Sequence, residues 1–194
     1  MEDKQLTKKG QEVRDRILLK TRDVLVKKGL DHLVMRDIAA ACDMKLGNLQ
    51  YYFKSREELL FAVIQRESIG DIRVIEDQLA NSVEARAALE SILERLLSRW
   101  LKEDGAAVYA MLNLYQLHRQ NFRALYQDIY ERHYKALEAV IKQLKPEVPA
   151  SERRMRAQLL TALIDGALAQ VVSGSSSKFT RRVTEQAIAI ALAD

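Results

Sequence analysis

Apolar residues recur every three to four positions along most of this chain, which is the spacing of an amphipathic α-helix. The pattern is strongest in the segments from about 8 to 28, from 89 to 101 and from 122 to 144. Strong helix formers such as Ala, Leu, Glu and Arg are abundant, whereas the 194 residues include only two prolines and seven glycines. Because spacing and composition both favour helix, the sequence predicts an all-α fold.

Helix-starting and helix-ending residues divide the pattern into about nine predicted helices. Gly29 is placed to end the first helix, and Pro146 ends the seventh. Ser55 and Glu58 have the capping-box spacing that starts the fourth. Residues 188–192 alternate as in a strand, but their alanines and the lack of a partner strand favour helix. The predicted helices span about 8–28, 35–42, 45–51, 55 onward, 89–104, 106–118, 122–144, 151–172 and 180–193.

Residues 38–53 combine two short predicted helices with a tight turn between them. Ile38, Met44 and Leu49 are apolar where the two helices face each other, and Ala39 is small where they must approach closely. Polar residues occupy the outer face of the second helix. This is the pattern of a helix-turn-helix motif, which places its second helix in the major groove of DNA.

A longer pattern around this motif resembles the TetR family of bacterial one-component regulators. It extends from about Arg16 to Leu60 and comprises Ile17-Leu18, Gly29, Asp37-Ile38-Ala39, Met44, Gly47, Leu49, Tyr52-Phe53, Arg56 and Leu59. The resemblance implies a three-helix DNA-binding domain in residues 1–54 and a helical ligand-binding and dimerisation domain in residues 55–194. It also implies a homodimer, with repression from a palindromic operator and release by a small molecule as the expected activity.

Three residues depart from the usual TetR pattern. Asp43 stands where the family usually has Gly, in a turn that needs a left-handed residue, and Asp tolerates that conformation better than most residues. Val34 replaces a Thr that commonly caps the second helix and touches phosphate, and Val can do neither. Gln50 replaces a Tyr, and because Gln can pair with adenine we expect this change to alter specificity more than binding.

On the TetR pattern, the second helix of the motif presents its polar face to DNA. Asn48, Gln50 and Arg36 carry donors suited to base edges, Leu46 suits a thymine methyl group, and Gly47 lets the backbone approach closely. The predicted DNA-binding residues are Arg36, Lys45, Leu46, Gly47, Asn48, Gln50, Tyr51, Tyr52, Lys54 and Arg56, of which Lys45, Tyr52, Lys54 and Arg56 are assigned to phosphates. For Tyr52 the alternative is a ring packed inward, and for Lys54 it is a solvated surface charge.

Charge adds modest support to this interpretation. The net charge is +4, and residues 1–60 hold 13 Lys and Arg against 10 Asp and Glu, so most of the excess lies with the predicted reading domain. A bias of this size is also common in cytoplasmic proteins, so charge alone does not indicate a nucleic-acid partner.

The last two predicted helices carry small and apolar residues suited to a dimer interface. A single recognition helix covers few base pairs, so specific binding needs two of them about one helical turn of DNA apart. The alternative is that both helices pack within one subunit. The predicted interface residues are Ala162, Gly166, Ala167, Ala169, Ala187, Ile188, Ala191 and Leu192.

Aromatic and polar residues gather in the middle of the chain, as expected for a pocket that binds a small organic effector. Aromatic residues at helical spacing are also common in an ordinary core, so both interpretations stay open. Asp165, an acid within an apolar run, suits either a cationic ligand or an interhelical hydrogen bond. The candidate pocket residues are Trp100, Tyr109, Tyr115, His118, Tyr126, Tyr130, His133 and Asp165.

Several other classes of protein are not expected. The three histidines lie on separate elements, and no metal-binding HExxH motif or glycine-rich phosphate loop occurs, which argues against an enzyme, a metal site and a bound cofactor. The single cysteine, Cys42, excludes an internal disulfide. A charged N-terminus and the lack of long apolar runs predict a cytoplasmic protein without a membrane span. The remaining alternative is a DNA-binding regulator controlled by a protein partner instead of a small ligand.

Overall fold

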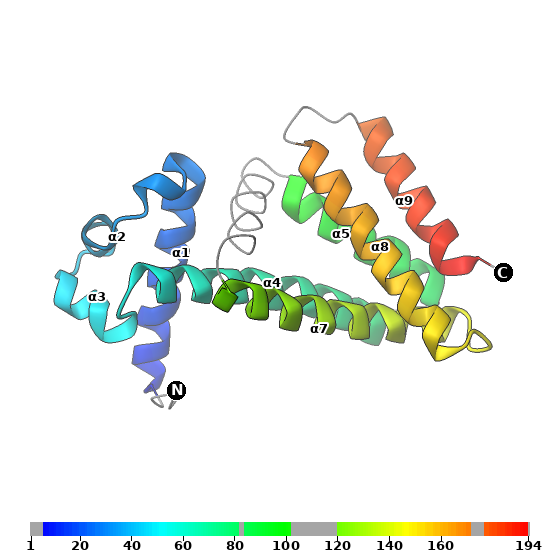
Figure 1. Cartoon of the computed structure of the whole chain (residues 1–194), viewed down its shortest axis with the longest axis horizontal. Helices are drawn as coiled ribbons and strands as arrows, with labels where there is room; N and C mark the ends of the chain where they lie inside the picture. Colours follow the sequence, from blue (N-terminus) through cyan, green and yellow to red (C-terminus); the bar gives the residue numbers. More distant parts are fainter. Residues whose placement is uncertain (1–5, 82–83, 102–119, 172–176, 194) are drawn as a thin grey trace. The chain divides into compact units, whose positions relative to one another are not determined.

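The computed structural model describes residues 6–81, 84–101, 120–171 and 177–193. All regular elements in these residues are helical, so the all-α prediction is confirmed (Figure 1). The predicted helix at 106–118 lies outside the described residues. The elements are α1 (Lys8–Lys28), the 3-10 helix η1 (Leu30–His32), α2 (Met35–Ala41), α3 (Leu46–Tyr52), α4 (Arg56–Asn81), α5 (Ala85–Leu101), α7 (Gln120–Leu144), α8 (Ala150–Val171) and α9 (Ser177–Leu192).

At the end of α1 and the start of α4, the structure contains local interactions that explain why the sequence pattern located these helix ends well. Gly29 has a φ of 78°, which favours glycine, and its N–H donates to the Leu25 carbonyl to end α1. At the start of α4, Ser55 Oγ accepts from the Glu58 N–H at 3.1 Å. The Glu58 carboxylate accepts from the Lys54 N–H at 2.9 Å, one residue before the cap, so this is a shifted form of the predicted capping box.

Contacts divide the chain into two compact units, Met1–Arg66 and Glu67–Asp194, and the division falls inside α4. In the first unit, α1 packs against α2 and α2 packs against α3. The largest side chains there with at most 2 % of their surface exposed are Ile17, Leu18, Leu25, Leu33, Ile38, Leu49, Phe53, Leu59 and Leu60.

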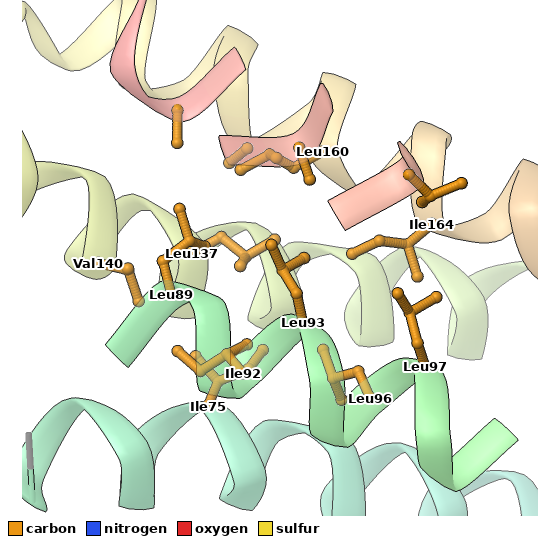
Figure 2. Close-up of a cluster of buried hydrophobic side chains, with 14 of the residues drawn as sticks. Ile75, Leu89, Ile92, Leu93, Leu96, Leu97, Leu137, Val140, Leu160 and Ile164 are labelled. Atoms are coloured by element: carbon orange, nitrogen blue, oxygen red, sulfur yellow. The ribbon is translucent and has the colours of Figure 1, made fainter. Parts of the chain in front are cut away.

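The second unit has a continuous apolar core around α5 (Figure 2). Leu89, Ile92 and Leu93 of α5 have no exposed surface, and they lie among residues from α4, α7, α8 and α9. Burying each such side chain stabilises the fold by about 1.5–3 kcal/mol relative to exposing it. This core is the rigid support for any binding site in the second unit.

A buried arginine fastens the end of α9 to α8. The Arg156 side chain is 5 % exposed, and its Nε donates to Glu152 on the same helix. Its Nη1 donates to the carbonyls of Ala193, at 2.7 Å, and Ala191. The last carbonyls of a helix have no hydrogen-bond partner within that helix. A cation that binds them satisfies these carbonyls and also interacts favourably with the helix dipole.

In the part of the chain described above, no helix has both the length and the apolar character needed to cross a membrane.

Candidate functional site

The turn between α2 and α3 has the geometry that the sequence predicts. Asp43 has a φ of 55° and is the sole residue other than glycine with a positive φ among the described residues. The Met44 N–H donates to the Ala39 carbonyl at 3.0 Å, which closes the turn. Asp therefore takes over the left-handed position that the family usually gives to Gly.

The inner, apolar face of the motif is buried. Ile38, Ala39, Leu49 and Phe53 are each no more than 2 % exposed, as predicted for core residues. Cys42 is also buried, and burial raises the pKa of its thiol. The thiol is thus kept neutral, which is typical of a small core residue rather than a reactive one.

The outer face of α3 is open to solvent. Tyr51 is 59 % exposed. Its ring packs edge to face against the Tyr52 ring, with 5.2 Å between the two ring centroids. Leu46 and Tyr52 are half-buried. The predicted DNA-binding residues that are exposed are Arg36, Lys45, Gly47, Asn48, Gln50, Tyr51 and Lys54. These side chains are accessible to a partner, and their contacts with DNA stay a prediction.

Val34 stands at the N-cap of α2 and makes no side-chain cap, as its apolar side chain requires. The first turn instead relies on backbone hydrogen bonds from Asp37 and Ile38 to the Val34 carbonyl, both 3.0 Å long. Val34 is 48 % exposed, so an apolar side chain is open to solvent at this helix start.

The structure gives Arg56 a protein partner that the sequence did not predict. Its Nη2 donates to the Leu30 carbonyl at 2.7 Å, and its Nε is buried without an acceptor among the described residues. Sequence analysis also overlooked Arg14, whose guanidinium lies over the Phe53 ring at 5.2 Å. No local signal marks either pairing, because the partners are far apart in the sequence.

Part of the predicted effector pocket is brought together between α7 and α8. The Tyr130 hydroxyl donates to Asp165 Oδ2 at 2.9 Å, so the interhelical hydrogen bond considered for Asp165 is present. The Tyr126 and Tyr130 ring centroids are 6.3 Å apart, and those of Tyr130 and Tyr134 are 5.9 Å apart in a stacked arrangement. His133 Nδ1 lies 2.8 Å from the Ile129 carbonyl. We call Tyr126, Tyr130, His133, Tyr134 and Asp165 the aromatic cluster.

Burial dominates the ionisation of this cluster. It raises the pKa of Tyr126 and Tyr134, and the negative charge of Asp165 adds to both effects. Burial lowers the pKa of His133, against an opposing effect of the Ile129 hydrogen bond and of Asp165. The rings of Tyr126, His133 and Tyr134 are therefore neutral at pH 7. The Arg154 guanidinium lies over the Tyr134 ring, 4.6 Å from its centroid. One face of this stack is thus already suited to a cation.

The other predicted pocket residues cannot be placed. Tyr109, Tyr115 and His118 lie outside the described residues, as does the side chain of Trp100. A separate groove of about 490 Å³ lies between α4 and α7, lined by Ile69, Ile72, Arg73, Ile75, Glu76, Leu79, Arg132, Lys135, Ala136 and Ala139. Arg132 and Lys135 pair with Asp128 and Glu131 on their own helix, so the groove has little unbalanced charge.

Three of the eight residues expected at a dimer interface belong to the core of a single subunit. Ala167, Ala187 and Ala191 are at most 4 % exposed because α8 and α9 pack on each other and on α5. A partner has no surface to contact there, and the expectation is corrected for these three. Ala162 is exposed, Gly166, Ile188 and Leu192 are half-buried, and the side chain of Ala169 is outside the description.

The other face of α8 carries residues that were not expected at the interface. Met155 is 52 % exposed and Leu159 is 50 % exposed. Met155, Leu159, Ala162 and Gly166 are separated by four, three and four positions in turn. This spacing places the four residues on one side of the helix. We call these four residues the outer α8 stripe.

An exposed helix on a buried helix-turn-helix core, followed by a second helical unit, is the arrangement expected of a DNA-binding transcriptional regulator. Residues 17–63 match the model of the bacterial regulatory proteins of the tetR family. Residues 85–194, more than half of the chain, match the C-terminal model of the BetI-type transcriptional repressors. The chain therefore belongs to the TetR family of bacterial transcriptional regulators.

Other known proteins agree with this placement. A TetR transcription regulator from Haloarcula marismortui has a TM-score of 0.80 and 19% identity, over 93% of this chain and 97% of its own. A transcriptional regulator from Saccharomonospora viridis, solved with choline, has a TM-score of 0.72 and 23% identity, over 91% and 94% of the two chains. Both similarities show that this chain shares the fold of these two proteins.

A sequence relative is an HTH-type transcriptional regulator in the dhlA 5′ region of Xanthobacter autotrophicus. It is 33% identical over 90 residues, and this alignment spans 45% of each chain.

Proposed function

We propose that this chain is a homodimeric cytoplasmic repressor that binds a palindromic operator through α3 and is released by a small organic cation. The observation that carries the DNA-binding part is the exposed set of donors on and beside α3, above a closed apolar core. Asn48 and Gln50 are exposed, and their side-chain amide groups can pair with adenine in the major groove. Lys45 and Lys54 are exposed beside them for phosphates.

The outer α8 stripe supports the dimer. Exposed Met155 and Leu159 continue into small residues at Ala162 and Gly166, so a second helix can approach the stripe closely. Glycine inside a helix costs about 1 kcal/mol relative to alanine. A Cβ at Gly166 would meet no described atom of its own chain within 4 Å, so the described part of the subunit gives no reason for this glycine. Close packing of the same helix from a partner subunit supplies one.

The aromatic cluster supports a cationic effector. Asp165 supplies a negative charge beside Tyr126, His133 and Tyr134, and the neutral rings offer π faces to a cation. The S. viridis neighbour was solved with choline, which makes choline a suitable first probe here. A ligand that prefers one conformer of the dimer by about 1.4 kcal/mol shifts the operator equilibrium tenfold.

The central test measures binding of the purified protein to DNA from upstream of its own gene, over a salt series. We expect affinity that depends on sequence and falls linearly with salt on logarithmic axes. Binding without either dependence would contradict the assignment. Adding choline should weaken the complex, and Asp165→Asn should abolish the response without weakening DNA binding. If choline and related cations leave operator binding unchanged, control by a protein partner becomes the better hypothesis.

A further inference from the structure

We propose that Arg56 is a positioning residue of the DNA-binding unit: it ties the chain segment that enters α2 to the first turn of α4 and does not bind a DNA phosphate. A basic residue at this place, beside exposed Lys54, would otherwise be assigned to the DNA backbone. The contacts of Arg56 point inward instead.

One hydrogen bond and the burial of Nε place the guanidinium inside the unit. Nη2 donates to the Leu30 carbonyl at 2.7 Å, and the Leu33 N–H donates to the same oxygen at 3.1 Å. Both acceptor directions of this carbonyl are therefore in use. Nε has no surface exposed to solvent. For Arg56 to reach a phosphate, the side chain would have to leave the protein and give up the bond to Leu30.

The segment held by this bond leads directly into the helix-turn-helix. Leu30 follows Gly29, which ends α1, and α2 begins at Met35. Between them, the Leu33 side chain is only 2 % exposed and anchors the segment in the core. Arg14 of α1, over the Phe53 ring, holds the other end of the motif. Two inward-facing arginines thus fix the entry and the exit of the motif that carries α3.

The exposed lysines provide the contrast. Lys45 and Lys54 flank α3 and are exposed, whereas Arg56 is half-buried. Removing one phosphate contact lowers the magnitude of the slope of log affinity against log salt by about 0.9, so a variant that loses the contact in both subunits of a dimer lowers it by about 1.8. Loss of a positioning bond instead lowers affinity by a constant factor at every salt concentration, because no counterion release is involved.

The experiment compares the full-length wild type with Arg56→Met and Lys54→Met. Operator affinity is measured over a salt series at a temperature far below the unfolding midpoint, where a lower stability alone cannot reduce affinity. Hydrogen exchange of the peptide covering residues 29–34 reports the tie itself. For Arg56→Met we expect faster exchange there, about tenfold weaker binding at all salt concentrations, and the wild-type slope. Lys54→Met should lower the slope and leave that exchange unchanged.

A slope whose magnitude is lowered by about 1.8 in the Arg56→Met dimer would overturn the proposal, whatever the exchange shows. So would wild-type exchange in residues 29–34, or wild-type affinity. If Arg56→Met does not fold, Arg56→Lys decides the question. Lysine keeps the charge but its Nζ reaches one bond less far than Nη2, so a positioning role predicts faster exchange and weaker binding, and a phosphate role predicts wild-type values for both. A wild type that binds DNA without a salt slope would contradict the proposed function, while the exchange measurement would still test the tie.

Discussion

At the scale of single residues, exposure separates the side chains that build the motif from those that can read DNA. Ile38, Leu49 and Phe53 are buried, and Asn48 and Gln50 are open to solvent on the same short segment. Sequence spacing predicted this division well because it follows from the helical period. It did not predict the hydrogen bond of Arg56, since nothing in the local sequence indicates a bond to a carbonyl 26 residues away.

Asn48 and Lys54 should behave differently when shortened to alanine. Asn48→Ala removes a base-edge donor, so it should reduce discrimination at particular base pairs by about 1–3 kcal/mol. Lys54→Ala removes a phosphate contact and should weaken every sequence alike, with a lower salt slope. Fluorescence anisotropy on a set of single-base operator variants measures both, and equal losses on all variants for Asn48→Ala would refute its role.

His133 should make folding stability depend on pH in the acidic range. Burial lowers its pKa in the folded protein below the ordinary value of 6.5. The unfolded chain therefore binds the proton first as the pH falls, and stability decreases from about pH 6.5 downward until the folded pKa is reached. Urea unfolding of wild type and His133→Asn between pH 5 and 8 should show a smaller loss in the variant. An identical pH dependence in both proteins would show that His133 contributes nothing.

At the scale of elements, two helical glycines have no steric justification among the residues that the structure describes. A Cβ at Gly47 of α3 or at Gly166 of α8 would meet no described atom within 4 Å. Each glycine costs its helix about 1 kcal/mol relative to alanine. Both lie on the surfaces that we assign to partners, DNA for α3 and a second subunit for α8.

Gly47→Ala should therefore separate folding from binding. We expect stability to stay level or rise by up to about 1 kcal/mol, because alanine is the better helix former. Operator affinity should fall at least tenfold, because the added methyl group stands where the duplex must approach. Thermal unfolding and anisotropy on the same preparation provide the two measurements. Unchanged affinity would show that DNA does not come close to Gly47.

At the scale of the whole molecule, the proposed function depends on a second copy of the chain. One short recognition helix gives weak binding, and a pair at a set spacing gives specificity. α8 has the composition this requires, because its inner face, with Leu160 and Ile164, packs in the subunit core while Met155 and Leu159 stay exposed.

Leu159→Glu should convert the dimer to a monomer and reduce operator binding strongly. Leu159 is half exposed in the subunit, so the change should cost the monomer fold little. Gln143→Glu is the matched control, since it adds the same charge at an exposed position on α7. Analytical ultracentrifugation gives the state of assembly. A dimer that persists in Leu159→Glu would exclude the outer α8 stripe as the interface.

The sequence by itself determined the helices, the turn at Asp43 and the family, because helical period, capping residues and turn chemistry are local properties. Tertiary structure alone decided which polar groups find partners and which apolar faces remain open. Arg56 meets Leu30, Tyr130 meets Asp165, and Ala187 and Ala191 close the core of their own subunit rather than facing a partner. Those outcomes depend on how distant segments pack together, which the spacing along one helix does not specify.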